Sequence, residues 1–151
     1  MLEGLFNPTN IGAIIRTCDS FGVGNVFYVG HELSNFRKRV SKSATGVEKW
    51  VSVKRYSTIG DCCAALHSKG YAICTTYDKT SSMPIDSADF TKPTAIVFGH
   101  EHRGVSEEAH RLADFNVRIP MRGLVGCMNV SVACGVILYE ATRQRNLKIL
   151  Q

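Results

Sequence analysis

Residues 118–145 read R-I-P-M-R-G-L-V-G-C-M-N-V-S-V-A-C-G-V-I-L-Y-E-A-T-R-Q-R, and they carry the most specific local pattern in the chain. It begins with a short β-type segment that ends at Pro120, and a glycine-bearing loop follows. Asn129 stands where a helix N-cap belongs, because its side chain can accept from an unpaired N–H of the first turn. Apolar residues then recur at helical spacing: Val130, Ala133, Cys134, Ile137 and Ala141. Because the first turns are apolar nearly all round, we expect this helix to be buried.

Strand and helix patterns alternate through the rest of the chain. Helices are predicted from Asn7-Pro8 to about residue 21, at 59–69 and at 106–113. Strands are predicted at the end of residues 1–6 and at 25–29, 51–53, 71–76, 95–98 and 116–119. This alternation indicates an α/β fold with a largely parallel sheet and helices on both faces. With no repeat or linker visible in 151 residues, we expect one domain over residues 1–151.

Composition narrows the class of protein. A hydrophobic content of 44% and a charged content of 21% are ordinary for a globular chain. No run approaches the roughly 18 apolar residues of a membrane span, and no secretory signal is visible, so we expect a cytoplasmic protein. The net charge of +5 is compatible with a polyanionic partner. We expect six reduced, buried thiols: Cys18, Cys62, Cys63, Cys74, Cys127 and Cys134.

Several common site types lack support in the sequence. The histidines of His100-Glu101-His102 have no third ligand at useful spacing, so we expect no metal. The glycines at 22 and 24 precede a strand, which is the wrong place for a dinucleotide-binding turn. Cys127 has no histidine near it in sequence to act as a base for covalent catalysis.

One long polar segment, residues 31–49, carries a cluster of cations. They are Arg37, Lys38, Arg39 and Lys42, with Lys49 at the end of the segment. A segment this long in a compact domain is often functional, and Arg and Lys supply the sequence-independent part of nucleic-acid affinity. The alternative interpretation is a solvated, charged loop.

Three polar segments each join a strand end to a helix: residues 7–19, 96–106 and 119–145. In open α/β sheets, ligands bind outside the carboxyl ends of the strands. We therefore expect the three segments to converge on one pocket.

The same three segments resemble a known family. The chain resembles, in order, the three motifs of the SpoU (TrmH-type) RNA ribose 2′-O-methyltransferases of the SPOUT superfamily. The first two matching stretches are N-P-T-N-I-G-A-I-I-R-T-C-D-S-F-G-V and I-V-F-G-H-E-H-R-G-V-S, and the third is residues 118–145. The resemblance implies a C-terminal deep trefoil knot, S-adenosylmethionine as cofactor, and a homodimer formed through the knotted region and the last helix. The substrate branch that it resembles most is tRNA methylated at a guanosine ribose.

The resemblance also assigns roles to individual residues. It implies a catalytic set of Arg16, Asn10, Glu101 and Asn129. It implies cofactor contacts from Thr76, Gly99, Ile119, Pro120, Cys127 and Met128. It places Arg143 and Arg145 at RNA-contacting positions, although cations at a helix C-terminus also suit the helix dipole. Simpler interpretations stay open for three of the catalytic set: Arg16 as a surface cation on the polar face of its helix, Asn129 as a helix cap, and Glu101 as a brace for its own loop.

Arg16 is the residue on which the implied mechanism centres. Methyl transfer from a sulfonium is an in-line displacement, so the protein must position a ribose hydroxyl and help it to lose a proton. Arginine is a poor base because its pKa exceeds about 12. We therefore favour Arg16 as an anchor for the substrate phosphate and 2′-oxygen, with a role as free base as the alternative.

Three residues depart from the family pattern. Cys127 stands where relatives usually carry Ser, Met128 where they carry Leu, and Gly126 where a larger residue is usual. These departures keep open a non-catalytic, RNA-binding relative with the same fold. Within the enzymatic interpretation, ribosomal RNA is the alternative substrate.

Overall fold

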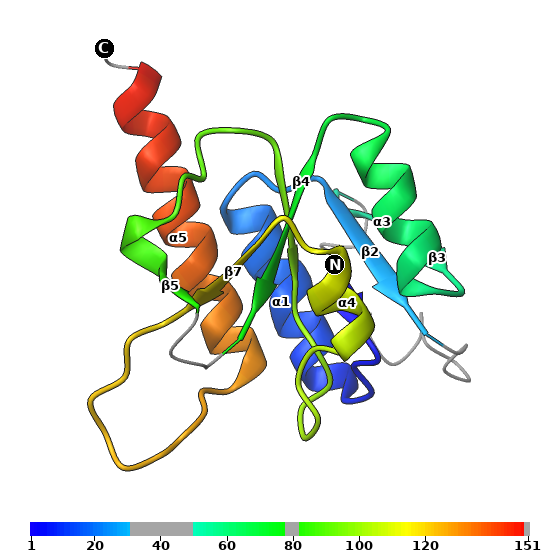
Figure 1. Ribbon diagram of the computed structural model, residues 1–151, viewed down its shortest axis with the longest axis horizontal. Coiled ribbons are helices and arrows are strands. Elements are labelled where there is room, and N and C mark those ends of the chain that lie inside the picture. The colour runs from blue at the N-terminus through cyan, green and yellow to red at the C-terminus, as the bar shows by residue number, and fades with distance from the viewer. Residues whose placement is uncertain (31–49, 78–81, 150–151) are drawn as a thin grey trace.

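The computed structural model describes residues 1–30, 50–77 and 82–149. Figure 1 shows helices packed around a twisted set of strands. The strands are β1 Leu2–Glu3, β2 Asn25–Val29, β3 Ser52–Tyr56, β4 Ala72–Thr76, β5 Met83–Pro84, β6 Thr94–Val97 and β7 Phe115–Arg118. The helices are α1 Pro8–Ser20, α3 Ile59–His67, the short 3-10 helix η2 Ile85–Ser87, α4 Glu107–Leu112 and α5 Val130–Ile149.

All paired strands run parallel, in two sheets with the orders β1-β2-β3 and β5-β7-β4-β6. The short β1 joins them, because Leu2 also forms a parallel bridge with Phe98. Glu3 N–H donates to the Phe98 carbonyl at 2.8 Å, and Phe98 N–H donates to the Met1 carbonyl at 3.0 Å. The carboxyl ends of the strands therefore share one edge. The predicted parallel α/β architecture is confirmed.

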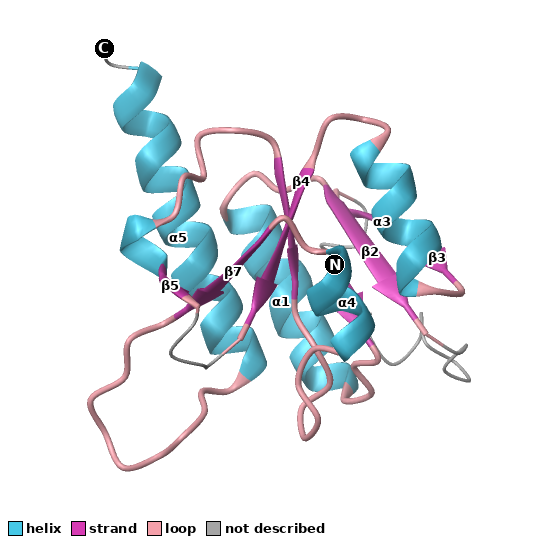
Figure 2. Ribbon diagram, in the orientation of Figure 1, coloured by secondary structure: helices cyan, strands magenta, loops and turns pink. Residues whose placement is uncertain are grey.

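Side chains alternate between two faces of the strands, and each face has its own core. Cys74 and Ile96 lie in a cluster with residues of α1 and α5. Their neighbours Ile73 and Val97 lie in a second cluster with residues of α3 and α4. The helices in Figure 2 accordingly cover both faces, as predicted.

Helix α1 forms as its sequence predicts. The Asn7 side chain accepts from Thr9 N–H at 2.9 Å, and Pro8 occupies the first helical position, where it costs no hydrogen bond. The predicted apolar stripe is buried: Ile11, Ile14, Ile15 and Cys18. The start of this helix lies shortly after the carboxyl end of β1.

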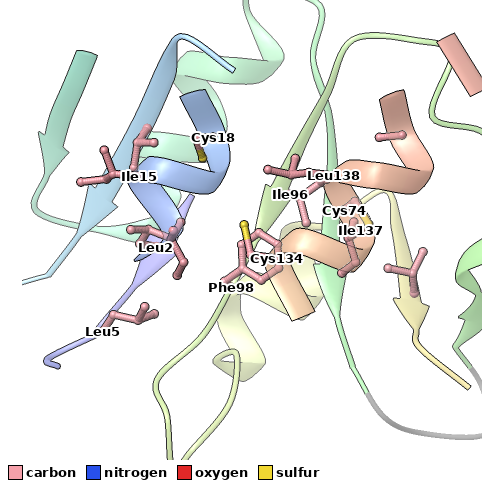
Figure 3. Packing of buried hydrophobic residues seen from close by; sticks show 14 of the residues in the cluster. Leu2, Leu5, Ile15, Cys18, Cys74, Ile96, Phe98, Cys134, Ile137 and Leu138 are labelled. Carbon is pink, nitrogen blue, oxygen red and sulfur yellow. The ribbon is translucent and has the colours of Figure 1, made fainter. Parts of the chain in front are cut away.

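Helix α5 is only partly buried, so the prediction of a buried helix was wrong. It packs against α1 and one face of the strands through Cys134, Ile137, Leu138 and Ala141 (Figure 3). Its opposite side leaves apolar residues exposed: Val132, Val136 and Tyr139, the last of them 60% exposed. A helix packed from one side buries one stripe, whatever the composition of the other.

Other sequence predictions needed smaller corrections. The strand predicted at 51–53 is longer and spans Ser52–Tyr56. The sequence prediction missed β5 and η2 because both are short, and because β5 contains Pro84 and η2 begins directly after it. All six cysteines are free thiols, but Cys127 is exposed, so its predicted burial was wrong. Burial raises the pKa of Cys62 to about 11 and that of Cys74 to about 12.

A cavity of about 540 Å³ lies at the other edge, where the strands begin. Its lining includes Cys18 and Val26 on one side and Ile96, Cys134 and Leu138 on the other. Residues of β2 and of β6 both line it, because the short β1 between them pairs with β2 at Tyr28 and Val29 and does not reach the amino half of that strand. This cavity is lined mostly by apolar groups, and all three segments predicted to converge contribute to its lining, through Ile14 and Cys18, Ile96 and Phe98, and Cys134 and Leu138. Within the described ranges, no helix has the length and apolar character needed to cross a membrane.

We expect Ile137→Ala to destabilise the protein by about 2–5 kcal/mol, because it opens a hole in the core between α5 and the strands. Ile137 is 1% exposed. The control on the same helix is Ile149→Ala, at a position 81% exposed, where we expect a change within about 0.5 kcal/mol. Urea unfolding measures both. Equal losses in the two variants would contradict the described packing of α5.

Candidate active site

The three segments predicted to converge meet at the carboxyl edge of the strands. In the register, Thr75 of β4 lies beside Val97 of β6, and Thr76 lies beside Val117 of β7. The chain that leaves β1 reaches the same edge, because Phe6 and Asn7 hydrogen-bond to Glu101 in the loop after β6. The segments therefore meet at this edge, as predicted, and the pocket expected between them stays a prediction.

Glu101 holds this edge together. Its carboxylate accepts from Asn7 N–H at 3.2 Å, from Phe6 N–H at 3.4 Å and from the Asn10 amide at 3.2 Å. The Asn10 carbonyl oxygen in turn accepts from the Asn129 amide at 3.2 Å. Three of the four predicted catalytic residues thus form one chain of hydrogen bonds, drawn from α1, the loop after β6 and the start of α5.

The Glu101 carboxylate is stabilised in its ionised form. Burial raises its pKa, but the hydrogen bonds it accepts from its own N–H, from Asn10, Asn7 and Phe6 outweigh burial and leave the pKa below its ordinary value. At neutral pH the group is an acceptor only. It can hold donors in place, and it has no proton to give.

Asn129 serves the helix and the network together. Its side-chain oxygen accepts from Ser131 N–H at 2.9 Å and from Val132 N–H at 3.4 Å. These two hydrogen bonds make Asn129 the N-cap of α5, as predicted. Its amide nitrogen remains available for Asn10. The capping interpretation is confirmed, and the same side chain also joins the predicted catalytic set.

Gly99 lets the loop that carries Glu101 close tightly. His100 N–H donates to the Gly104 carbonyl at 3.0 Å, and Gly104 N–H donates back to His100 at 2.8 Å. A Cβ on the buried Gly99 would collide with the backbone of Gly104 and Val105. Only glycine therefore fits where these two backbone segments touch.

The remaining predicted cofactor positions surround this edge. Thr76, whose hydroxyl donates to the Val97 carbonyl at 3.1 Å, and Ile119 are half-buried at the ends of β4 and β7. Pro120, Cys127 and Met128 lie in residues 120–129, which are exposed throughout and run out from the body of the molecule in Figure 1.

The predicted cations do not gather here. Arg16 is exposed on α1, six residues after Asn10 and hence about 9 Å further along the helix axis, outside the Glu101 network. Arg143 forms a bidentate pair with Glu140, at 2.7 and 2.8 Å. Arg145 donates to the backbone carbonyls of Phe90 and Lys92 and so links α5 to the loop between η2 and β6. The RNA contacts assigned to the two α5 arginines stay predictions.

Four other predicted RNA contacts lie outside the described residues: Arg37, Lys38, Arg39 and Lys42. Within the described part of the chain, no group of three His, Cys, Asp or Glu side chains is arranged to hold a metal ion.

Sequence reasoning missed two features of this edge. One is a set of rings, Phe6, His100 and His102, packed within 6 Å of one another. The other is a buried polar group in which the Thr75 hydroxyl contacts Asn116 and lies 2.9 Å from His110. Periodicity and motif spacing carry no signal for either, because each joins residues from separate strands and loops.

The sequence pattern of the SpoU rRNA Methylase family matches residues 1–139. The tRNA (guanosine(18)-2′-O)-methyltransferase of Escherichia coli strain K12 is 41% identical over 144 residues, which cover 95% of this chain and 62% of that protein. The chain therefore spans less than two thirds of the length of that curated relative.

Solved structures have the same fold over nearly the whole of this chain. The A. aeolicus TrmH/SpoU tRNA modifying enzyme has a TM-score of 0.87 and 36% identity, over 97% of this chain and 74% of that one. The SpoU methyltransferase AviRb from Streptomyces viridochromogenes, solved in complex with the cofactor AdoMet, has a TM-score of 0.88 and 29% identity, over 96% of this chain and 56% of that one.

We expect Glu101→Gln to destabilise the fold by about 1–3 kcal/mol at pH 7, because it removes a charged acceptor from several donors. The folded-state pKa of Glu101 is lowered, so this stabilisation is present above the unfolded value of about 4.5 and is lost as pH falls through the folded-state pKa. Urea unfolding at pH 7 and at pH 3 measures the difference between variant and wild type, which should narrow at pH 3. The control is the exposed Glu107→Gln. A difference as large at pH 3 as at pH 7 would contradict the described role of the carboxylate.

Proposed function

The chain belongs to the SpoU rRNA Methylase family, and on this premise we propose that it transfers a methyl group from S-adenosylmethionine to a ribose 2′-oxygen of RNA, at a guanosine of tRNA. The observation that carries the proposal is the linkage of Asn10, Glu101 and Asn129 at the carboxyl edge of the strands. The tRNA (guanosine(18)-2′-O)-methyltransferases among the relatives support the choice of substrate.

The residues at this edge fit S-adenosylmethionine. When bound, that group supplies a sulfonium-activated methyl and its own leaving group. Backbone N–H and C=O groups can hydrogen-bond to the edges of adenine. The exposed residues 120–129 and the closely packed turn at Gly99 supply such backbone groups. We assign the contacts to Thr76, Gly99, Ile119, Pro120, Cys127 and Met128. A solved relative that holds AdoMet supports the choice of cofactor.

Each side chain then has a defined task. Glu101 and Asn10 hold the start of α1 against the loop after β6, and Asn129 fixes the start of α5 to them. Arg16 anchors the substrate phosphate and the 2′-oxygen, and its positive charge favours the ionised hydroxyl. Because arginine is a poor base, Arg16 stabilises the charge that develops on the 2′-oxygen, the hydroxyl proton leaves to solvent water, and S-adenosylhomocysteine departs once the S–CH3 bond has broken.

We further propose that the C-terminal part forms a deep trefoil knot and that two copies pair through it and through α5. The knot rests on the resemblance of the three motifs, and one observation supports the pairing. Val132, Val136 and Tyr139 form an exposed apolar stripe on α5, beside an exposed loop containing Leu124 and Val125. Pairing would bury both.

A second copy also accounts for the position of Arg16. In one chain Arg16 lies outside the Glu101 network, so we propose that each site takes residues from both copies, with Arg16 among the residues that complete it. Arg143, Arg145 and the cations of residues 31–49 are proposed to hold the RNA backbone. We propose residues 1–151 as one methyltransferase domain that acts in the cytoplasm.

Two other functions each have one observation in their favour. The family description itself names rRNA, which supports ribosomal RNA as the other substrate class. Cys127 and Gly126 are exposed and depart from the family pattern that the sequence resembles, which favours a non-catalytic RNA-binding protein. Calorimetry with S-adenosylmethionine separates enzyme from binder, since no heat at millimolar cofactor favours the second.

We expect the wild-type protein to transfer labelled methyl to tRNA, and Arg16→Ala to lower kcat by at least about 100-fold, because it removes charge stabilisation formed in the transition state. Cofactor binding should not change. The control is Arg111→Ala on the exposed surface of α4. Mass spectrometry of the product locates the methyl group. Full activity in Arg16→Ala, or methylation at a base, would contradict the proposed mechanism.

We expect the wild-type protein to sediment as a dimer and Val136→Glu to sediment as a monomer, because a charge in the centre of the exposed α5 stripe is costly to bury. Analytical ultracentrifugation measures the mass, and circular dichroism checks that the variant is folded. The matched control is Leu147→Glu, at an exposed position near the end of the same helix. A dimeric Val136→Glu would contradict the interface.

A further inference from the structure

Three aromatic rings form a cluster at the carboxyl edge of the strands. The ring centroids of Phe6 and His100 lie 5.0 Å apart, those of Phe6 and His102 lie 5.9 Å apart, and those of the two histidines lie 5.8 Å apart. All three pairs are tilted, and these separations are typical of interacting rings. The three therefore form one contiguous surface built from two separate segments of the chain.

Glu101 places this cluster directly beside the hydrogen-bonded network. His100 and His102 flank Glu101 in sequence, and the Glu101 carboxylate accepts from the backbone N–H of Phe6 at 3.4 Å. The contact that holds Asn7 and Asn10 therefore also brings the Phe6 ring to the two histidines. A molecule that reaches the Asn10 and Asn129 side chains passes close to these rings.

The cluster is open to solvent in a way that a core contact would not be. Phe6 is 46% exposed, and His102 is also exposed. The His100 ring is oriented by His102 N–H, which donates to His100 Nδ1 at 3.1 Å. A neutral His100 therefore carries its proton on Nε2, which leaves that nitrogen as a donor. An exposed phenyl ring beside an oriented imidazole offers both a flat apolar surface and a polar contact.

A nucleobase matches this surface better than an aliphatic ligand does. Proteins that recognise RNA loops splay out single bases and stack them on Phe, Tyr, Trp or His side chains, with hydrogen bonds to the base edges. We propose that Phe6, His100 and His102 form a stacking subsite for one unstacked base of the RNA, beside the ribose that is methylated. The inference rests on the proposed function for its choice of RNA as ligand.

The subsite has a direct test in RNA binding, which needs no turnover. We expect Phe6→Ala to weaken binding of fluorescently labelled tRNA by about 5- to 100-fold, the range that corresponds to one lost base–aromatic contact. Fluorescence anisotropy measures the affinity. In turnover, the same variant should raise KM for tRNA. Phe6→Trp should restore binding, because it keeps a flat ring.

The matched control is Tyr71→Ala. Tyr71 is 36% exposed, like Phe6 an accessible aromatic, but it lies just before the start of β4, at the other edge of the strands. It should leave tRNA affinity unchanged. S-adenosylhomocysteine binding is measured in parallel on each variant by calorimetry.

Each outcome has a defined meaning. Weakened tRNA binding in Phe6→Ala, with recovery in Phe6→Trp and unchanged S-adenosylhomocysteine affinity, supports the subsite. Unchanged tRNA affinity overturns it, and so does a loss confined to S-adenosylhomocysteine, which would place the cofactor's adenine on these rings. If the wild-type protein binds tRNA through Phe6 but transfers no methyl, the proposed function fails and the subsite stands.

Discussion

The carboxylate of Glu101 is the contact on which the described site depends. It gathers donors from residues that are more than 90 positions away in the sequence, and it fixes the start of α1 against the loop after β6. Parallel strands bring the ends of many segments to one edge, but they leave those segments free to diverge. Glu101 joins two of them, and Asn10 extends the link to Asn129 at the start of α5.

Two local features make that link possible. Gly99 allows the loop to fold back until backbone touches backbone, which presents the Glu101 side chain toward Asn7. The Asn7 and Asn129 caps begin their helices at this edge, so the polar starts of α1 and α5 face each other while their apolar stripes pack deeper. The same residues therefore serve folding and the proposed chemistry.

Much of this could be predicted from sequence, for identifiable reasons. The stripe of α1 and the cap at Asn129 are local patterns of three or four residues, and both were confirmed. The burial of α5 was overestimated, because composition does not say which side of a helix the rest of the chain covers. The Phe6 cluster and the Thr75 to Asn116 contact join separate segments, so no local pattern encodes them. The roles of Arg16, Arg143 and Arg145 in binding RNA stay predictions.

A double-mutant cycle between Asn10 and Glu101 measures whether the Glu101 carboxylate holds α1 through the Asn10 side chain. The free energies of unfolding of Asn10→Ala, Glu101→Gln and the double variant are compared with that of the wild type by urea titration at pH 7. A coupling of about 0.5–3 kcal/mol between the two sites is predicted, as is usual for residues that share one hydrogen-bond network. If the losses in unfolding free energy are strictly additive, Glu101 does not hold α1 through Asn10.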